Sequence, residues 1–189
     1  MINSDADNND IIEMLNTIGN QHINDRSDDY PRNTVLIAAT KNETRYAVLL
    51  HILQIGNIDI NIRNNKNETA LIVATQYANI NAVDKIKDNL PNGLQDINLT
   101  DNTGRIALDW ANWMIITCRN ITDYPEYIEN EEIDLPRNIY PSNLCDMLNG
   151  QTLQTLPILI GKYYTIETIL YYFMLDSEGE TTGPEDDFY

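Results

Sequence analysis

A six-residue pattern recurs along this chain at a constant spacing of 37 residues. In each copy, glycine is followed four residues later by isoleucine and five residues later by asparagine, at 19–24, 56–61 and 93–98. A fixed period between about 20 and about 50 residues is typical of stacked repeats, in which each unit packs only against its neighbours. Stacked repeats present extended surfaces more often than catalytic pockets, so the spacing directs the search for function towards a partner.

A run with helical character precedes each copy of the pattern. These runs lie at 11–15, 48–53 and 83–87. Glycine just beyond the last helical turn adopts the left-handed conformation that ends a helix, so Gly19, Gly56 and Gly93 are predicted helix stops. Polar turns follow the second and third copies, at 64–67 and 101–104. Further helices, whose alanines allow close packing, are predicted at 34–40, 69–75 and 106–112.

These motifs resemble the core pattern of the ankyrin-repeat family. In that family an Asp- or Asn-led turn precedes Gly-x-Thr-Pro-Leu-His-x-Ala, and a second helix ending in Leu-Leu precedes Gly-x-Asp-Ile/Val-Asn. Here Asp101–Arg105, Asn67–Leu71 and the Asp-Ile-Asn triplets at 59–61 and 96–98 stand in the same order. The similarity runs from about Ile11 to Cys118.

The chain departs from the family at Thr-Pro-Leu-His, which becomes Thr-Val-Leu-Ile, Thr-Ala-Leu-Ile and Ile-Ala-Leu-Asp. Loss of the histidine weakens a hydrogen bond that stabilises the family's turn, so less regular repeats are expected. The resemblance implies an all-α fold, namely an ankyrin-repeat solenoid of stacked helix pairs with short β-hairpin loops and atypical terminal caps. Four parts are predicted: an acidic amino-terminal segment with a half-repeat cap at 1–28, repeats at 29–150, capping helices at 151–175 and an acidic tail at 176–189.

Both ends of the stack are expected to be irregular. Residues 11–24 match only the second helix and outgoing loop of a repeat. An insertion at about 119–141 interrupts the third repeat, and its delayed second helix is predicted at 143–150, with Gly150 as the stop. The segments 155–164 and 165–175 are interpreted as a closing helix pair.

Acidic residues are concentrated at the two ends of the chain. Residues 1–29 hold seven acids and one base, 30–122 hold eight acids and nine bases, and 123–189 hold fourteen acids and two bases. Because no concentrated basic face exists, nucleic-acid binding is not expected. Two interpretations of these acidic residues remain open. They keep the protein soluble, because acidic ends prevent stacks from joining end to end, or they attract a basic partner.

Several classes of location and chemistry are disfavoured. No apolar run approaches the roughly 18 residues of a membrane span, and the amino terminus lacks the features of a secretory signal. We therefore expect a cytoplasmic protein with no membrane contact, a monomer when unbound, with Cys118 and Cys145 as buried, reduced thiols. His22 is interpreted as a turn residue and His51 as structural. With no motif for a cofactor, a metal or a catalytic triad, an enzyme is not expected.

The resemblance also implies where a partner binds, because ankyrin-repeat proteins use hairpin tips and the concave face of each first helix. The implied tips are Tyr30, Asn65, Lys66, Glu68, Asn102 and Arg105. The implied concave positions are Lys41, Asn42, Gln76, Tyr77, Trp113 and Met114. Tyrosine, tryptophan, methionine and arginine are enriched at interfaces, although the insertion offers an alternative in which it buries Trp113 and Met114. Trp110 aligns with a core position.

The leading hypothesis is a non-enzymatic protein–protein interaction module. One alternative is an acidic inhibitor or immunity-type protein that neutralises a basic toxin or nuclease, because the carboxyl-terminal third is strongly acidic. Another is an adaptor like viral and parasite ankyrin proteins, linking a host protein to a larger complex through a second element at 135–175.

Overall fold

The structure is a computed structural model that describes residues 7–18, 21–121, 128–129, 132–135, 137, 140 and 142–179. Expectations for Gly19, for most of the insertion and for the tail from residue 180 onward lie outside these residues. Helices dominate the described chain, which confirms the all-α class. The helices are α1 (Asn8–Ile18), α2 (Val35–Thr40), the 3-10 turn η1 (Glu43–Arg45), α3 (Tyr46–Gln54), α4 (Ala70–Gln76), α5 (Ile80–Asp88), α6 (Leu94–Ile97), α7 (Ala107–Ile121), α8 (Ser142–Leu148) and α9 (Thr155–Gly179).

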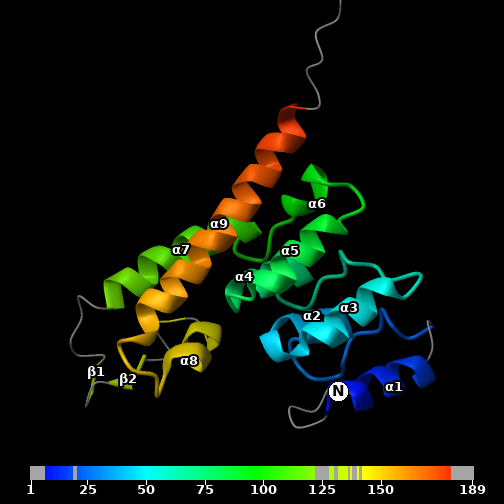
Figure 1. Cartoon of the computed structure of the whole chain (residues 1–189), viewed down its shortest axis with the longest axis horizontal. Coiled ribbons are helices and arrows are strands. Elements are labelled where there is room, and N and C mark those ends of the chain that lie inside the picture. Colours follow the sequence, from blue (N-terminus) through cyan, green and yellow to red (C-terminus); the bar gives the residue numbers. More distant parts are fainter. Residues whose placement is uncertain are drawn as a thin grey trace, which may run out of the picture.

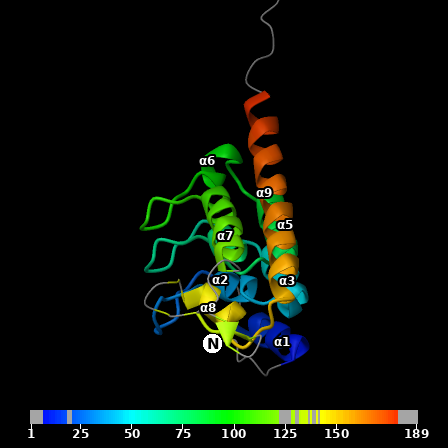
Figure 2. The ribbon, with the colours of Figure 1, turned by 90° about the vertical axis from the view of Figure 1, so that its left-hand side faces the viewer.

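The helices pack in two rows. One row contains α1, α3, α5 and α9, and the other contains α2, α4 and α7. The pairs α2/α3, α4/α5 and α7/α9 join the rows. Figure 1 shows α1 at one end of this stack and α7 with α9 at the other. In Figure 2 the loops that precede α2, α4 and α7 project on the same side, away from the row of α3, α5 and α9.

Backbone hydrogen bonds join each of these loops to the next. The N–H of Asn65 donates to the carbonyl of Pro31 at 2.8 Å, and the N–H of Asn102 donates to the carbonyl of Lys66 at 3.0 Å. The loops are tight turns without paired strands, which corrects the predicted β-hairpins. In the described chain, strands occur only in the insertion, as β1 (Ile128–Glu129) and β2 (Glu132–Ile133).

The helix starts follow from local capping chemistry. The hydroxyl oxygens of Thr34 and Thr69 accept hydrogen bonds from the third backbone N–H of α2 and α4, at 3.2 and 3.3 Å. In the third copy Ile106 has no oxygen to offer, and the Asp109 carboxylate instead accepts from the N–H of Ile106 at 3.1 Å. The helix starts predicted near 34, 69 and 106 are confirmed.

The predicted glycine stops are only partly confirmed. Gly150 lies just beyond α8 with φ 76°, in the left-handed region, as expected. After α3, however, the left-handed residue is Asn57, with φ 73°, and not Gly56. Gly93 is left-handed with φ 49°, but it precedes α6 and does not directly close α5.

The carboxyl-terminal helix differs from the prediction. Residues 155–179 form one continuous helix, α9, and not a closing pair broken near residue 164. Its buried side chains recur every three or four residues and are Leu156, Leu159, Tyr163, Ile166 and Leu170. Pro157 lies in the first turn, where a missing N–H is tolerated, so nothing interrupts the helix.

The prediction for the second helix of the third pair is also wrong. It is α9 that packs along α7 and against α5, and α8 at 142–148 is not the delayed partner helix. The reason is length, because α9 presents a far longer apolar stripe than α8 can. The insertion therefore extends to residue 154. It is held by strand-like bonds in which the Ile133 N–H donates to Gln151 and the Gly150 N–H to Ile133, both at 2.9 Å.

Tyr163 joins α9 to the middle of the stack. Its side chain is fully buried, and its hydroxyl donates to the carbonyl of Gln76, the last residue of α4, at 2.8 Å. This bond, together with the packing of α9 against α5, ties the carboxyl-terminal helix directly to the second helix pair.

We expect Tyr163→Phe to lower the free energy of unfolding by about 1–2 kcal/mol, because the buried carbonyl loses its donor. Chemical denaturation followed by circular dichroism measures this change. The matched control is Tyr172→Phe, since Tyr172 is 60% exposed on the same helix, and its effect should stay within about 0.5 kcal/mol. Equal effects for the two variants would contradict the assigned role of the bond.

Both cysteines are free and buried, which confirms the prediction of buried thiols. Burial raises the pKa of the Cys118 thiol to about 12. Because the unfolded thiol ionises near 9.0, deprotonation favours the unfolded chain above that pH. The stability contributed by the protonated thiol is present at lower pH and is lost as pH rises towards 12.

Cys118→Ala should therefore flatten the alkaline limb of the stability curve. We expect the difference in unfolding free energy between the parent and the variant to shrink as pH rises above about 9. Urea denaturation at a series of alkaline pH values measures it. A difference that stays constant with pH would show that Cys118 does not titrate as described.

Candidate binding surface

A cleft of about 260 Å³ opens between the stacked loops, the adjoining ends of α2 and α4, and α8. Its lining includes six of the residues predicted to contact a partner. These six are Tyr30, Lys41, Lys66, Glu68, Gln76 and Tyr77. The other described residues of the lining are Pro31, Val73, Ser142 and Asp146. Residues from two successive loops and from α2 and α4, which belong to the inner row of α2, α4 and α7, therefore converge on one cleft.

Glu68 forms the polar floor of this cleft. It is only 7% exposed, and its carboxylate accepts hydrogen bonds from Asn64 Nδ2 at 2.7 Å and Gln76 Nε2 at 3.0 Å. Asn64 in turn accepts from the backbone N–H groups of Lys66 and Glu68 with its Oδ1, at 2.9 and 3.0 Å. Both Glu68 oxygens are thus held in place, and a negative charge is fixed at the base of the cleft.

Lys41 and Tyr77 form the wall next to Glu68. Lys41 Nζ lies 5.6 Å from the centroid of the Tyr77 ring, which is within range of a cation–π interaction. Burial lowers the pKa of Lys41, and Glu68 and Asp146 partly oppose that shift. Burial raises the pKa of Tyr77, and the charges of Asp146 and Glu68 raise it further, so its hydroxyl stays protonated and able to donate.

The lining of the cleft suits the binding of polar or aromatic groups. It offers a cation, a carboxylate, a phenol and an amide within one small space. No histidine or cysteine is among the described residues that line it. The arrangement suits recognition by hydrogen bonds and ion pairs.

A second hollow, of about 370 Å³, continues this surface towards the amino-terminal end. It shares Tyr30, Pro31 and Lys41 with the cleft and reaches Ile18 and His22. Tyr30 lies at the border of the two and is 73% exposed. The cleft and this hollow together form one continuous surface, the concave surface.

Arg105 and Trp113 come together beyond the cleft, at the third loop. The guanidinium carbon of Arg105 lies 5.3 Å from the centroids of both Trp110 and Trp113. The two indoles meet edge to face, with centroids 5.3 Å apart. Trp110 is 6% exposed, which confirms its predicted place in the core, and Trp113 is half-buried beside it.

Asp101 anchors this aromatic cluster. One of its oxygens accepts from Trp110 Nε1 at 2.7 Å, and the other accepts from the backbone N–H groups of Thr103 and Arg105 at 2.7 and 3.2 Å. Burial raises the pKa of Asp101, but hydrogen bonds from Thr103, Trp110 and Arg105 outweigh it, and the pKa lies below its usual value.

Other predicted contact residues lie elsewhere. Met114 is completely buried in the core of the stack, where α7 packs against α4 and α9, so the prediction that it touches a partner is wrong. Asn65 and Asn102 are exposed at the loop tips, as expected, and Asn102 Nδ2 donates to the Asn65 carbonyl at 3.2 Å. Asn42 is exposed at the turn between α2 and α3, away from the cleft lining, where its Oδ1 accepts from the Thr44 N–H at 3.0 Å.

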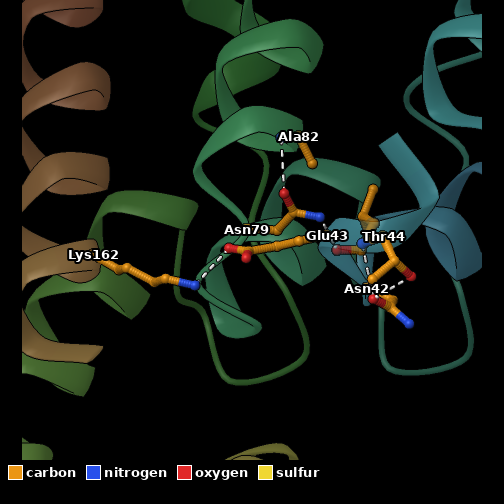
Figure 3. Close-up of polar contacts among 7 residues, drawn as sticks. Asn42, Glu43, Thr44, Asn79, Ala82 and Lys162 are labelled. Carbon is orange, nitrogen blue, oxygen red and sulfur yellow. Dashed lines mark hydrogen bonds and ion pairs between the residues drawn. The ribbon is translucent and has the colours of Figure 1, made fainter. Parts of the chain in front are cut away.

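Sequence reasoning missed the contribution of the carboxyl-terminal third. Asp146 and Ser142 of α8 line the cleft, whereas the sequence pattern predicts 143–150 in the row of second helices. Figure 3 shows a further long-range contact, in which Lys162 of α9 reaches Glu43 in the turn after α2 at 2.7 Å. Lys162 and Glu43 belong to helix pairs that are not adjacent, so no sequence signal predicts this ion pair.

The two histidines lie where structural roles are expected. His22 Nδ1 is 2.7 Å from an Asp25 carboxylate oxygen in an exposed turn. His51 Nε2 is 3.0 Å from Asn16 Oδ1, which links α3 to α1. Neither lies near the other or near a cysteine side chain in a described contact.

Comparison with known proteins adds no relative: no family model matches the chain, and no curated protein matches it. None of the helices in the described residues is both long enough and apolar enough to cross a membrane.

Acid should remove the contribution of the ionised Asp101 carboxylate to the free energy of unfolding. Its depressed pKa means that the contribution is present above the ordinary value of 3.8 and is lost as pH falls below that value. We expect Asp101→Asn to be destabilised by about 1–3 kcal/mol at neutral pH, and the difference from the parent to narrow as pH falls below about 4. Urea denaturation followed by tryptophan fluorescence measures it. A difference in unfolding free energy between the parent and the variant that widens as pH falls would contradict this role of Asp101.

Proposed function

We propose that this protein is a non-enzymatic interaction module, built as an ankyrin-like stack, that binds another protein on its concave surface. The observation that carries the proposal is the convergence of Tyr30, Lys41 and Tyr77 on one cleft. These residues lie on separate elements, and the resemblance to the ankyrin-repeat family implies a binding role for each of them. The two rows of helices, the stacked loops and the threonine caps support the ankyrin-like part of the proposal.

The chemistry of the surface supports a protein as the ligand. Tyr30 and Tyr77 supply aromatic area at low entropic cost, and Arg105 with Trp113 supplies a second group of the same kind at the next loop. Fixed charges of both signs, Lys41 and Glu68, give orientation and specificity more than affinity. Such a surface suits a partner that presents an aromatic or polar side chain between two complementary charges.

The acidic carboxyl-terminal third makes an inhibitor of a basic protein the second candidate. Asp146 carries this acidity into the cleft itself, although it is paired with Arg137 at 2.7 Å. A basic partner would be steered by the net negative charge, and its association rate would fall steeply with added salt. An adaptor role has no supporting contact among the described residues, so it remains one outcome of the binding experiment.

The test begins with capture of the partner from an extract of the source cells and then measures affinity by isothermal titration calorimetry. We expect the double variant Tyr30→Ala with Tyr77→Ala to weaken binding at least about thirtyfold, because both aromatic groups border the cleft. The matched control is Tyr172→Ala, an exposed tyrosine on α9 outside the concave surface. Its affinity should equal that of the parent.

Binding that survives the double variant would overturn the concave surface as the site. Salt then separates the candidates. An affinity that changes little between low and physiological salt supports the interaction module proposed first. An affinity that falls steeply as salt is added supports the inhibitor of a basic protein. Recovery of a multi-subunit assembly that depends on residues 135–175 would favour the adaptor.

A further inference from the structure

The last inner helix, α7, exposes a polar row with one large apolar residue. The row consists of Asp109, Asn112, Ile116 and Arg119, which are spaced by three, four and three residues and are not buried. That spacing places them on one side of the helix. Ile116 is 57% exposed and belongs, with Ile18 and Ile158, to the exposed isoleucines of the described helices.

The last outer helix, α9, exposes a matching row. It consists of Tyr164, Thr168, Tyr171 and Leu175, spaced by four, three and four residues. Tyr164, Tyr171 and Leu175 are 39%, 48% and 43% exposed. The guanidinium carbon of Arg119 lies 5.3 Å from the centroid of the Tyr164 ring, so the two rows are adjacent. Together they form the end face, which is defined by these eight residues.

The end face is the side on which a further helix pair would stack. The inner helix α4 has a neighbouring inner helix on each side, α2 and α7, whereas α7 packs only against α4 and α9 among the principal helix contacts of the described chain. Terminal repeats usually present a polar outer face to water. Here half of the eight residues are large and apolar or aromatic, and the two charges are of opposite sign.

The end face is self-complementary when its rows are paired in opposite directions. In an antiparallel pair of α7 helices, Asp109 lies opposite Arg119 of the second copy and Asn112 lies opposite its Ile116. In an antiparallel pair of α9 helices, Tyr164 lies opposite Leu175 of the second copy and Thr168 lies opposite its Tyr171. A twofold axis in the plane of the face, perpendicular to the helices, produces both pairings at once.

We propose that the end face is a dimer interface, in which two copies of this chain stack end to end through α7 and α9. Two helices side by side cover roughly 20 Å by 25 Å, so two copies bury on the order of 1,000 Å², the lower limit for a specific interface. The dimer is therefore weak and forms at micromolar concentrations. This proposal differs from the monomer expected from the sequence, and it is independent of the concave surface.

The net charge of −17 on each copy opposes association, and salt reduces that repulsion. Asp109 and Arg119 balance each other on the face itself, so the repulsion arises elsewhere on the chain. Sedimentation equilibrium at physiological salt, over about a hundredfold range of concentration, should show a monomer–dimer equilibrium. Sedimentation of a single monomeric species at every concentration would overturn the proposal.

Two substitutions with the same chemistry locate the interface. Ile116→Asp places a charge in the middle of the end face and should raise the dissociation constant at least about tenfold. Ile18→Asp is the matched control, because Ile18 is 45% exposed on α1 at the other end of the stack, and its dissociation constant should equal that of the parent. Circular dichroism checks that both remain folded, and Tyr171→Arg serves as a second interface variant. Equal dissociation constants for Ile116→Asp and Ile18→Asp would overturn the proposal.

A charge swap tests the antiparallel pairing. Asp109→Arg places two arginines opposite each other across the interface and should weaken the dimer several-fold. Adding Arg119→Asp restores opposite charges and should recover the parent dissociation constant. Both variants lose the bond from the Ile106 N–H to the Asp109 carboxylate, so that loss cannot explain recovery. A double variant no tighter than Asp109→Arg alone would rule out this pairing.

Discussion

The stack depends on an amide or carboxylate oxygen at the start of the second and third loops, which in each loop accepts hydrogen bonds from two backbone N–H groups. Asn64 does this in the second loop and Asp101 in the third, at positions one 37-residue period apart. Each such oxygen folds five residues into a tight turn and leaves one N–H at the tip free to donate to the preceding loop. The loops thereby set the spacing of the helix pairs, and the inner helices pack at the distance that the loops allow.

The carboxyl-terminal third completes the stack and shapes its binding surface at the same time. Helix α9 supplies the second helix that the third pair lacks, and it reaches back to Gln76 and Glu43 in earlier pairs. Helix α8, which lies between α7 and α9 in the sequence, brings Asp146 to the cleft beside Lys41 and Tyr77. The insertion thus supplies part of the cleft lining through α8, and the negative charge of Asp146 contributes to the raised pKa of Tyr77.

Much of the fold can be predicted because its signals are local. Thr34 and Thr69 mark helix starts through bonds to an N–H three residues away, and Asn64 and Asp101 mark turns through bonds within five residues. The family resemblance implies β-strands in the loops. That prediction is wrong because the tight turns leave no residues that could pair as strands. Half of the predicted contact residues do line one cleft. The prediction for Met114 fails because its side chain is completely buried, and no local pattern encodes how other helices pack against α7.

The sequence by itself determined the repeat period, which recurs in plain residue identities, and the helix starts, which depend on residues within one turn of one another. Through the family resemblance it also indicated the all-helical class and the place of Trp110 in the core. The tertiary structure decided which segment pairs with α7, since α8 and α9 both carry apolar side chains and only the area each can bury distinguishes them. It likewise decided that Asp146 lies in the cleft with Lys41 and that Tyr164 meets Arg119 on the end face. Those contacts join segments that are distant in the sequence, and they exist only once the helices have packed.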